Sequence, residues 1–206
     1  MKRIFVGSVC FILSILCLAG CGQKAAPEPS SAAAQGQAKP VQKTLSEEEM
    51  TTLKPLLDAV AACAEKEFKQ VPDPATAAMV VYALVNSDVY TEADGERTQT
   101  WVSDALLEKI YTDCFENTKT PLDFSSFSLM ERKDNGYTFS PSDTGQGAKI
   151  ETLSSEKTNN DTYQIKVNIK SYDDLELSGT GKFIVRKNKN SKFGFCIVSW
   201  EYVWNA

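Results

Sequence analysis

The sequence predicts an α+β fold in which three N-terminal helices pack on one face of a bent, cone-like antiparallel β-meander. Two observations lead to this fold class. Apolar residues recur every three or four positions between Met50 and Phe68, which is the spacing of one helical face. Beyond Pro121 the pattern changes, and apolar and polar residues alternate from Tyr163 to Lys170, as in a half-exposed strand. With 206 residues, 42% of them hydrophobic, the chain can form one domain with its own core and an appendage.

Local signals place the three helices. Residues Ser46-Glu47-Glu48-Glu49 form a capping box, so we expect the first helix to begin there. Pro55 falls inside the apolar pattern of this helix and should kink or divide it. The pair Asp73-Pro74 is a typical helix start, and the apolar segment behind it predicts a buried second helix. The third helix is expected from about Gln99 to Asn117.

Turn residues and alternation place the strands. Asp134-Asn135-Gly136 is typical of a hairpin turn. Residues 175–187 predict a strand in which Gly179 and Gly181 mark a bend or a bulge. The last strand is expected over residues 193–204.

This order of elements, over roughly residues 46 to 204, resembles the nuclear-transport-factor-like (cystatin-like) cone fold. The resemblance rests on the order of helices and strands and on the glycine-interrupted strand, and no diagnostic residue motif accompanies it. Catalytic members of that superfamily, such as those that resemble ketosteroid isomerase, place carboxylates and tyrosines inside the cone. No position of this chain matches such a residue, so no catalytic residue is assigned.

The N-terminus has the features of an export signal. Lys2 and Arg3 precede an apolar run that ends at Ala19, and small residues follow it. This run is shorter than the roughly 20 residues that a permanent membrane-spanning helix needs. We therefore expect residues 1–20 to be a signal peptide.

Residues Leu18-Ala19-Gly20-Cys21 resemble, at every position, the lipobox of bacterial lipoproteins. The resemblance implies that the chain is cut before Cys21 and that the sulfur of this residue carries a diacylglycerol. The residue after Cys21 is Gly22. In Gram-negative lipoproteins an aspartate at this position resembles a signal for retention in the inner membrane, so its absence favours the outer membrane. The expected location is therefore the cell envelope: the outer membrane facing the periplasm in a Gram-negative host, and otherwise the outer face of the cytoplasmic membrane. There are two alternatives. The segment could be an ordinary signal peptide with an incidental cysteine, or it could be a single membrane anchor.

Residues 21–44 predict a flexible tether behind the lipidated cysteine. Between Gly22 and Lys43 the chain is rich in Ala, Gln and Pro, and Val41 is its only large apolar residue. Such a segment cannot bury enough apolar surface to offset the entropy lost on ordering. The single folded domain is expected over residues 45–206.

Composition limits the chemistry of this domain. The chain has no His, which excludes Ser-His-Asp and Cys-His catalysis and imidazole metal ligands, although Asp, Glu, Tyr, Lys and Cys remain available. No metal-binding or phosphate-binding motif is found, and no cofactor is implied. The formal net charge is −5, and loss of Lys2 and Arg3 makes the chain more acidic. An acidic surface argues against nucleic acid as a partner.

Two residue groups allow more than one interpretation. Cys63 and Cys114 lie on apolar helix faces and could form a disulfide in an oxidising compartment; the alternative is that both, with Cys196, are buried thiols. Trp200 and Tyr202 share a face of the last strand with Cys196, Val198 and Trp204. These aromatic residues either pack beneath the helices or line an apolar pocket at the mouth of the cone.

These observations predict a membrane-anchored envelope lipoprotein whose domain is a non-enzymatic module that binds an unknown ligand or envelope protein. One alternative is a small-molecule enzyme or carrier that uses the cavity of the cone. Another is a structural envelope protein that acts through an exposed sheet face. A cavity that holds a carboxylate with a raised pKa favours the enzyme, whereas a filled interior favours binding at the surface.

Overall fold

The computed structural model describes residues 44–63, 67–69, 72–87, 89–94, 96–125, 128–140, 148–171 and 176–205. All of them belong to one compact unit, Pro40–Ala206. The expected signal peptide, Cys21 and the tether up to residue 43 lie outside the described residues.

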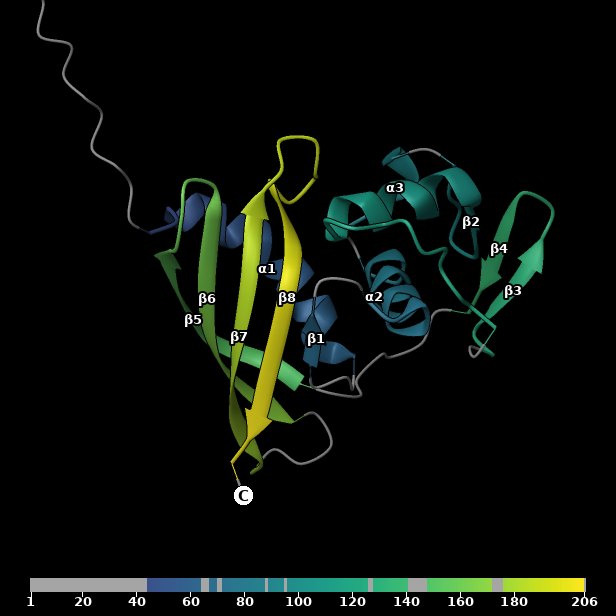
Figure 1. Ribbon diagram of the computed structural model, residues 1–206. Coiled ribbons are helices and arrows are strands. Elements are labelled where there is room, and N and C mark those ends of the chain that lie inside the picture. The colour runs from purple at the N-terminus through teal and green to yellow at the C-terminus, as the bar shows by residue number, and fades with distance from the viewer. Residues whose placement is uncertain are drawn as a thin grey trace, which may run out of the picture. The chain divides into compact units, whose positions relative to one another are not determined.

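The described part of the chain contains three helices and two antiparallel sheets, which confirms the α+β class (Figure 1). The helices are α1 (Glu47–Ala62), α2 (Pro74–Val85) and α3 (Asp104–Cys114). The larger sheet has the order β1-β8-β7-β6-β5 and consists of β1 (Glu67–Lys69), β5 (Ala148–Lys157), β6 (Thr162–Ser171), β7 (Ser178–Lys187) and β8 (Phe195–Trp204). The smaller sheet has the order β2-β4-β3 and consists of β2 (Trp101–Ser103), β3 (Met130–Lys133) and β4 (Gly136–Phe139).

The capping box starts α1 as predicted. The backbone N–H of Glu49 donates to Ser46 Oγ at 3.1 Å, and the N–H of Ser46 donates to Glu49 Oε2 at 2.9 Å. The helix runs on through Pro55, so the proline does not divide it. Three leucines around Pro55 are fully buried: Leu53, Leu56 and Leu57. Their packing stabilises the helix although proline cannot donate a backbone hydrogen bond.

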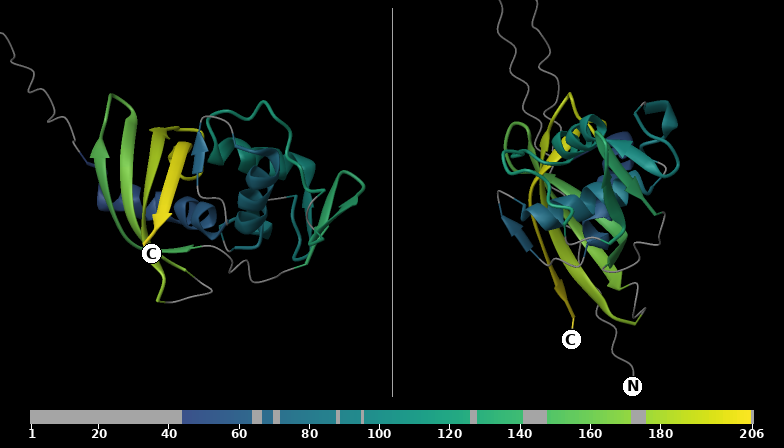
Figure 2. Two further views of the ribbon diagram at one scale, coloured as in Figure 1. Left: turned by 60° about the horizontal axis from the view of Figure 1, so that its bottom comes forward. Right: turned by 90° about the vertical axis from the view of Figure 1, so that its right-hand side faces the viewer.

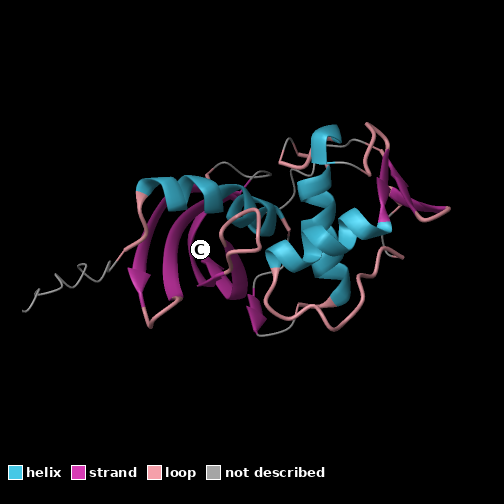
Figure 3. Cartoon of the chain, turned by 90° about the horizontal axis from the view of Figure 1, so that it is seen from above, coloured by secondary structure: helices cyan, strands magenta, loops and turns pink. Residues whose placement is uncertain are grey.

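α1 lies over one face of the larger sheet (Figure 3). Near its start, the N–H of Leu45 donates to Ser155 Oγ of β5 at 2.9 Å. At its end, the hydroxyl of Tyr202 on β8 donates to the carbonyl of Cys63 at 3.1 Å. We call the face that carries Ser155 and Tyr202 the inner face, and the opposite one the outer face.

α2 begins at the predicted Asp73-Pro74 pair. The side chain of Asp73 accepts from the N–H of Ala75 at 3.0 Å, and most residues of the helix are buried. α2 contacts α1 and α3, while α3 contacts the larger sheet at β8. Phe115, directly behind α3, forms a parallel β-bridge with Ile197, and its ring lies 6.4 Å from that of Trp200.

The prediction of one helix from Gln99 to Asn117 was wrong at its start. Residues Trp101–Ser103 form β2, which pairs with β4, and the helix begins only at Asp104. Ser103 is its cap, because its hydroxyl accepts from the N–H of Leu106 at 3.0 Å. The predicted hairpin at Asp134 joins β3 and β4, and Asp134 has a positive φ of 52°. A three-residue strand such as β2 has too short a pattern to be separated from a helix by periodicity.

A bulge at Gly179 and Gly181, one of the two expected irregularities, is absent, since both glycines pair in register with β6 and β8. The glycines instead allow close packing. A Cβ on Gly181 would lie only 2.8 Å from Val167 Cγ2, and one on Gly179 only 2.3 Å from the carbonyl oxygen of Val203.

The register shifts instead at one position in β5, between Ile150 and Thr152, and at one position in β8. Ser199 pairs with Ile184 but Ile197 pairs with Val185, so Val198 is an extra residue in β8. Beyond this bulge the alternation of faces reverses. Ile197 therefore shares the inner face with Trp200, and Cys196 does not, in contrast to the face predicted from simple alternation.

In the described part of the chain the three cysteines are buried and none of them is in a disulfide: Cys63, Cys114 and Cys196. This corresponds to the alternative without a disulfide. Burial raises the pKa of Cys114 well above its ordinary value, and the nearby Asp113 adds to this effect. A thiol with a raised pKa is a poor nucleophile, so Cys114 does not fit a reactive cysteine.

Candidate functional site

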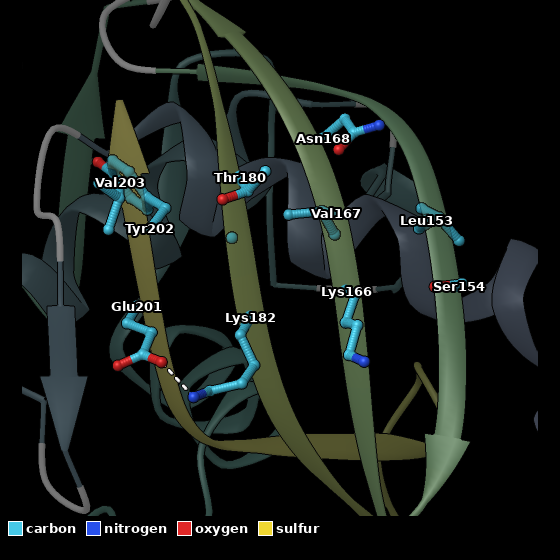
Figure 4. A pocket seen from close by; sticks show the side chains of 11 residues that line it. Leu153, Ser154, Lys166, Val167, Asn168, Thr180, Lys182, Glu201, Tyr202 and Val203 are labelled. Carbon is cyan, nitrogen blue, oxygen red and sulfur yellow. Dashed lines mark ion pairs between the residues drawn. The ribbon is translucent and has the colours of Figure 1, made fainter. Parts of the chain in front are cut away.

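A hollow of about 590 Å³ lies on the larger sheet, across four neighbouring strands (Figure 4). Its lining comes from β5, β6, β7 and β8: Leu153, Ser154, Lys166, Val167, Asn168, Thr180, Gly181, Lys182, Glu201, Tyr202 and Val203. Its volume is within the range of small-molecule sites, roughly 300–1,000 Å³. The hollow opens to solvent and is not an enclosed cavity, because Lys166, Asn168, Thr180 and Val203 are all exposed.

The strand register aligns the outer-face residues of the hollow in two rows. One row crosses the sheet as Ser154, Lys166, Lys182 and Glu201. The next row contains Asn168, Thr180 and Val203. On β6, β7 and β8 the first row carries long charged side chains and the second carries shorter, uncharged ones, so the second row forms the floor of a shallow trough. Beyond the floor, Lys170 is ion-paired with Glu151 at 3.5 Å.

The charges at the hollow are unevenly paired. Lys166 and Lys182 face each other on β6 and β7, an arrangement in which like charges repel. Lys182 forms an ion pair with Glu201. Lys166 has no ion-pair partner among the residues that the structure describes. An exposed ammonium group therefore remains at this wall of the hollow.

The floor offers polar and apolar contacts side by side. The hydroxyl of Thr180 and the amide of Asn168 are exposed, and both groups can donate and accept hydrogen bonds. Val203 is 65% exposed and adds an apolar group to the floor. The floor can therefore offer hydrogen bonds and one apolar contact to a molecule that lies on it.

The inner face, in contrast, is filled by side chains. The rings of Phe183 and Trp200 are 1% and 2% exposed, and Val167 and Tyr202 are buried next to them. Trp200 therefore belongs to the core and does not line the hollow. Tyr202 is in the lining, but its hydroxyl is bonded to Cys63 on the inner side. Of the two aromatic residues suggested for a pocket, neither presents its ring to solvent.

One carboxylate and one tyrosine do meet in the interior, away from the hollow. The hydroxyl of Tyr90 and the ammonium of Lys109 both donate to Asp113 Oδ2, each at 2.6 Å. Burial, and then this bond to Asp113, raise the pKa of Tyr90. The hydroxyl of Ser191, in the turn between β7 and β8, donates to the backbone carbonyl of Asp113 at 2.7 Å. Because these polar groups have partners within the protein, we interpret the cluster as a link between α3 and this turn.

Three described carboxyl groups have a pKa that departs clearly from the ordinary value, and none of the three suits a general acid. The pKa of each of these groups is below its ordinary value: Glu49, Asp94 and Asp123. Hydrogen bonds from Lys192 and Ser125 are the main cause for Asp94 and Asp123. A general acid at neutral pH needs a raised pKa. In the part of the chain that is described, no group of three or more Cys, Asp or Glu is placed to hold a metal ion.

The sequence carries a weak signal for the hollow. Lys166 and Asn168 belong to the polar half of the alternating segment from Tyr163 to Lys170, and the alternation predicts only that they are exposed to solvent. Their alignment with Thr180, Lys182 and Glu201 depends on the register between strands, which alternation alone does not determine.

Comparisons with protein-family models, curated proteins and solved structures found no match. None of the helices in the described ranges is long and apolar enough to cross a membrane. The geometry of the hollow and the N-terminal sequence are therefore the two sources for a functional proposal.

Proposed function

We propose that this chain is an exported lipoprotein of the cell envelope, anchored through Cys21, whose domain binds a ligand or another protein without catalysing a reaction. The lipobox and the export signal support the anchor. Two acyl chains hold a protein at a membrane far more stably than one, since each buried methylene contributes about 0.8 kcal/mol. The binding surface is the hollow on the outer face.

The observation that carries the binding proposal is the contrast between a filled inner face and an open outer face. Large aromatic side chains occupy the inner face, while the outer face exposes Thr180, Asn168 and Val203 around a hollow. A ligand of moderate size can reach the outer face without any rearrangement of the core.

The cone-like arrangement belongs to this proposal too. α1 covers the inner face, and α3 contacts the sheet at β8, so a sheet that curves around the helices would leave its outer face free. Figure 2 shows the curvature of the larger sheet in two further directions. The alternative function, an enzyme or carrier, would instead require a ligand-sized space on the inner face.

Labelling with radioactive palmitate tests the anchor. Wild-type protein is expected to incorporate the label, and Cys21→Ser is expected to lose it and to accumulate as an uncut or wrongly processed precursor. A wild-type chain without label would contradict the lipoprotein assignment.

Native mass spectrometry tests the binding surface, with the full lipidated chain extracted from the envelope in detergent. We expect a bound ligand or subunit that is lost in Thr180→Arg, because the arginine fills the floor of the hollow. Thr112→Arg, on the exposed side of α3, is the matched control and should retain the bound mass. A bound mass that both variants retain would place the ligand elsewhere and favour the carrier alternative.

A further inference from the structure

Lys166 gives the hollow a preference for one kind of ligand. Its ammonium lies at the wall of the hollow without an ion-pair partner in the described part of the chain, whereas its neighbour Lys182 is paired with Glu201. The cross-strand neighbour of Lys166 is Lys182, and Glu201 neutralises only one of these two cations, so the local charge at this wall is positive although the chain has a formal net charge of −5. A negatively charged group placed at Lys166 would also relieve its repulsion with Lys182.

We propose that the hollow binds an acidic segment of a partner protein, with a carboxylate of that segment at Lys166. This inference rests on the proposed function, because it assumes that the outer face is the binding surface. Lys166 supplies up to three hydrogen-bond donors to the carboxylate. Across the floor, the amide of Asn168 can pair with a peptide group, since both carry one donor and one acceptor side.

The apolar end of the floor determines what accompanies the carboxylate. Val203 is 65% exposed and lies in the same row as Asn168 and Thr180. An apolar side chain of the bound segment can cover Val203 and remove both surfaces from water. The expected sequence therefore combines an acidic residue with an apolar one.

Glu201 argues against ligands of high charge density. Its carboxylate lies on the same wall of the hollow and neutralises Lys182. A polyphosphate or a phosphorylated headgroup is usually bound by several cations or by arginine forks, and Lys166 alone does not provide them. A single carboxylate matches the one exposed ammonium better.

Fluorescence anisotropy with two labelled peptides tests this inference on the full chain in detergent. The first peptide is Glu-Val-Glu-Val-Glu and the second is its uncharged analogue Gln-Val-Gln-Val-Gln. We expect the acidic peptide to bind more tightly, and Lys166→Gln to weaken its binding about fivefold, as expected for one exposed ion pair. Lys133→Gln, at an exposed position of β3, is the matched control and should bind as the wild type does.

A gain-of-binding variant strengthens the test. Glu201→Gln removes the partner of Lys182 and makes a second ammonium available, so the acidic peptide should bind more tightly, by a factor of about two to five. The shift of the urea midpoint of each variant shows whether it remains folded.

Three results would overturn the inference. The first is equal binding of both peptides, and the second is an equal loss of peptide binding in Lys166→Gln and Lys133→Gln. The third is that the peptide does not bind while a uronic-acid oligosaccharide binds in a manner that depends on Lys166. If Thr180→Arg removes a bound partner but the peptides fail, the proposed function stands without this inference. If Thr180→Arg has no effect on the partner, the proposed function fails first.

Discussion

The inner and outer faces of the larger sheet are built from alternate residues of the same strands, yet they differ in almost every property. On β8 the inner-face Trp200 is 2% exposed, while Val203 on the outer face is 65% exposed. On β7 the inner-face Gly181 leaves room for Val167 and Tyr202, and its neighbour Thr180 contacts solvent. The comparison indicates that side chains of the inner face contribute most of the packing, whereas side chains of the outer face can change at little cost to the core.

Truncating a buried ring of the inner face and an exposed apolar side chain of the outer face should give the largest contrast. Trp200→Ala removes a buried ring that packs against Phe115, and we expect it to destabilise the domain by about 3–5 kcal/mol. Val203→Ala should change the free energy of unfolding by less than about 0.5 kcal/mol, because the side chain is mostly exposed. The urea midpoint at constant slope measures both. A loss below about 1 kcal/mol in Trp200→Ala would show that the ring is not part of the core.

Two adjacent residues of β7 allow a closer comparison. In Gly181→Ala the new Cβ would lie 2.8 Å from Val167 Cγ2 and 3.2 Å from Tyr202 Cβ, so the inner face must shift. We expect a destabilisation of about 1–3 kcal/mol. Thr180→Ala, one residue away on the outer face, should cost less than about 1 kcal/mol. Thermal unfolding followed by circular dichroism measures both losses of stability. A larger loss in Thr180→Ala than in Gly181→Ala would refute the assignment of faces.

The fold and the site differ in how far the sequence predicts them. The capping box at Ser46, the Asp73-Pro74 helix start and the alternation from Tyr163 to Lys170 are local signals, and each is found in the structure. The start of α3 and the face of Cys196 were wrong, because β2 and the bulge at Val198 arise from pairing with distant strands.

The hollow was not predicted for the same reason. Lys166 and Lys182 are each recognisable as exposed strand residues, but only the register between β6 and β7 places them opposite each other. Val203 lies between Tyr202 and Trp204 in the sequence, so alternation alone places it on the face opposite Trp200, and in the structure it is exposed. Its role at the end of a trough follows only once β6, β7 and β8 are aligned.

A buried polar cluster outside both faces gives a test of intermediate size. Tyr90→Phe removes the hydroxyl that donates to Asp113 Oδ2 and leaves this buried carboxylate with one bond fewer. Lys109 still donates to the carboxylate, so the expected cost is that of one hydrogen bond to a charged group, about 1.5–3 kcal/mol. Tyr137→Phe is a matched control, since this half-buried ring in β4 lies outside the cluster. If both variants unfold at the same urea concentration, the cluster does not link α3 to the turn between β7 and β8.

The smallest expected effect concerns the start of α1, the helix that covers the inner face. Burial acts to raise the pKa of Glu49, but hydrogen bonds from Lys187 and from the backbone of Ser46 outweigh it, so the pKa lies below the ordinary value of 4.5. A lowered pKa in the folded state means that the ionised carboxylate contributes stability above the pKa of the unfolded chain. This contribution is lost as the pH falls through the lower pKa of the folded state. Glu49→Gln should therefore be less stable than the wild type at pH 7, by less than about 1 kcal/mol, and nearly as stable at pH 3. Glu48→Gln, an exposed position in the same helical turn, controls for the loss of one charge near the helix N-terminus. Urea midpoints at both pH values measure the difference in stability between each variant and the wild type. If the difference for Glu49→Gln is the same at both pH values, the ion pair with Lys187 does not stabilise the start of α1.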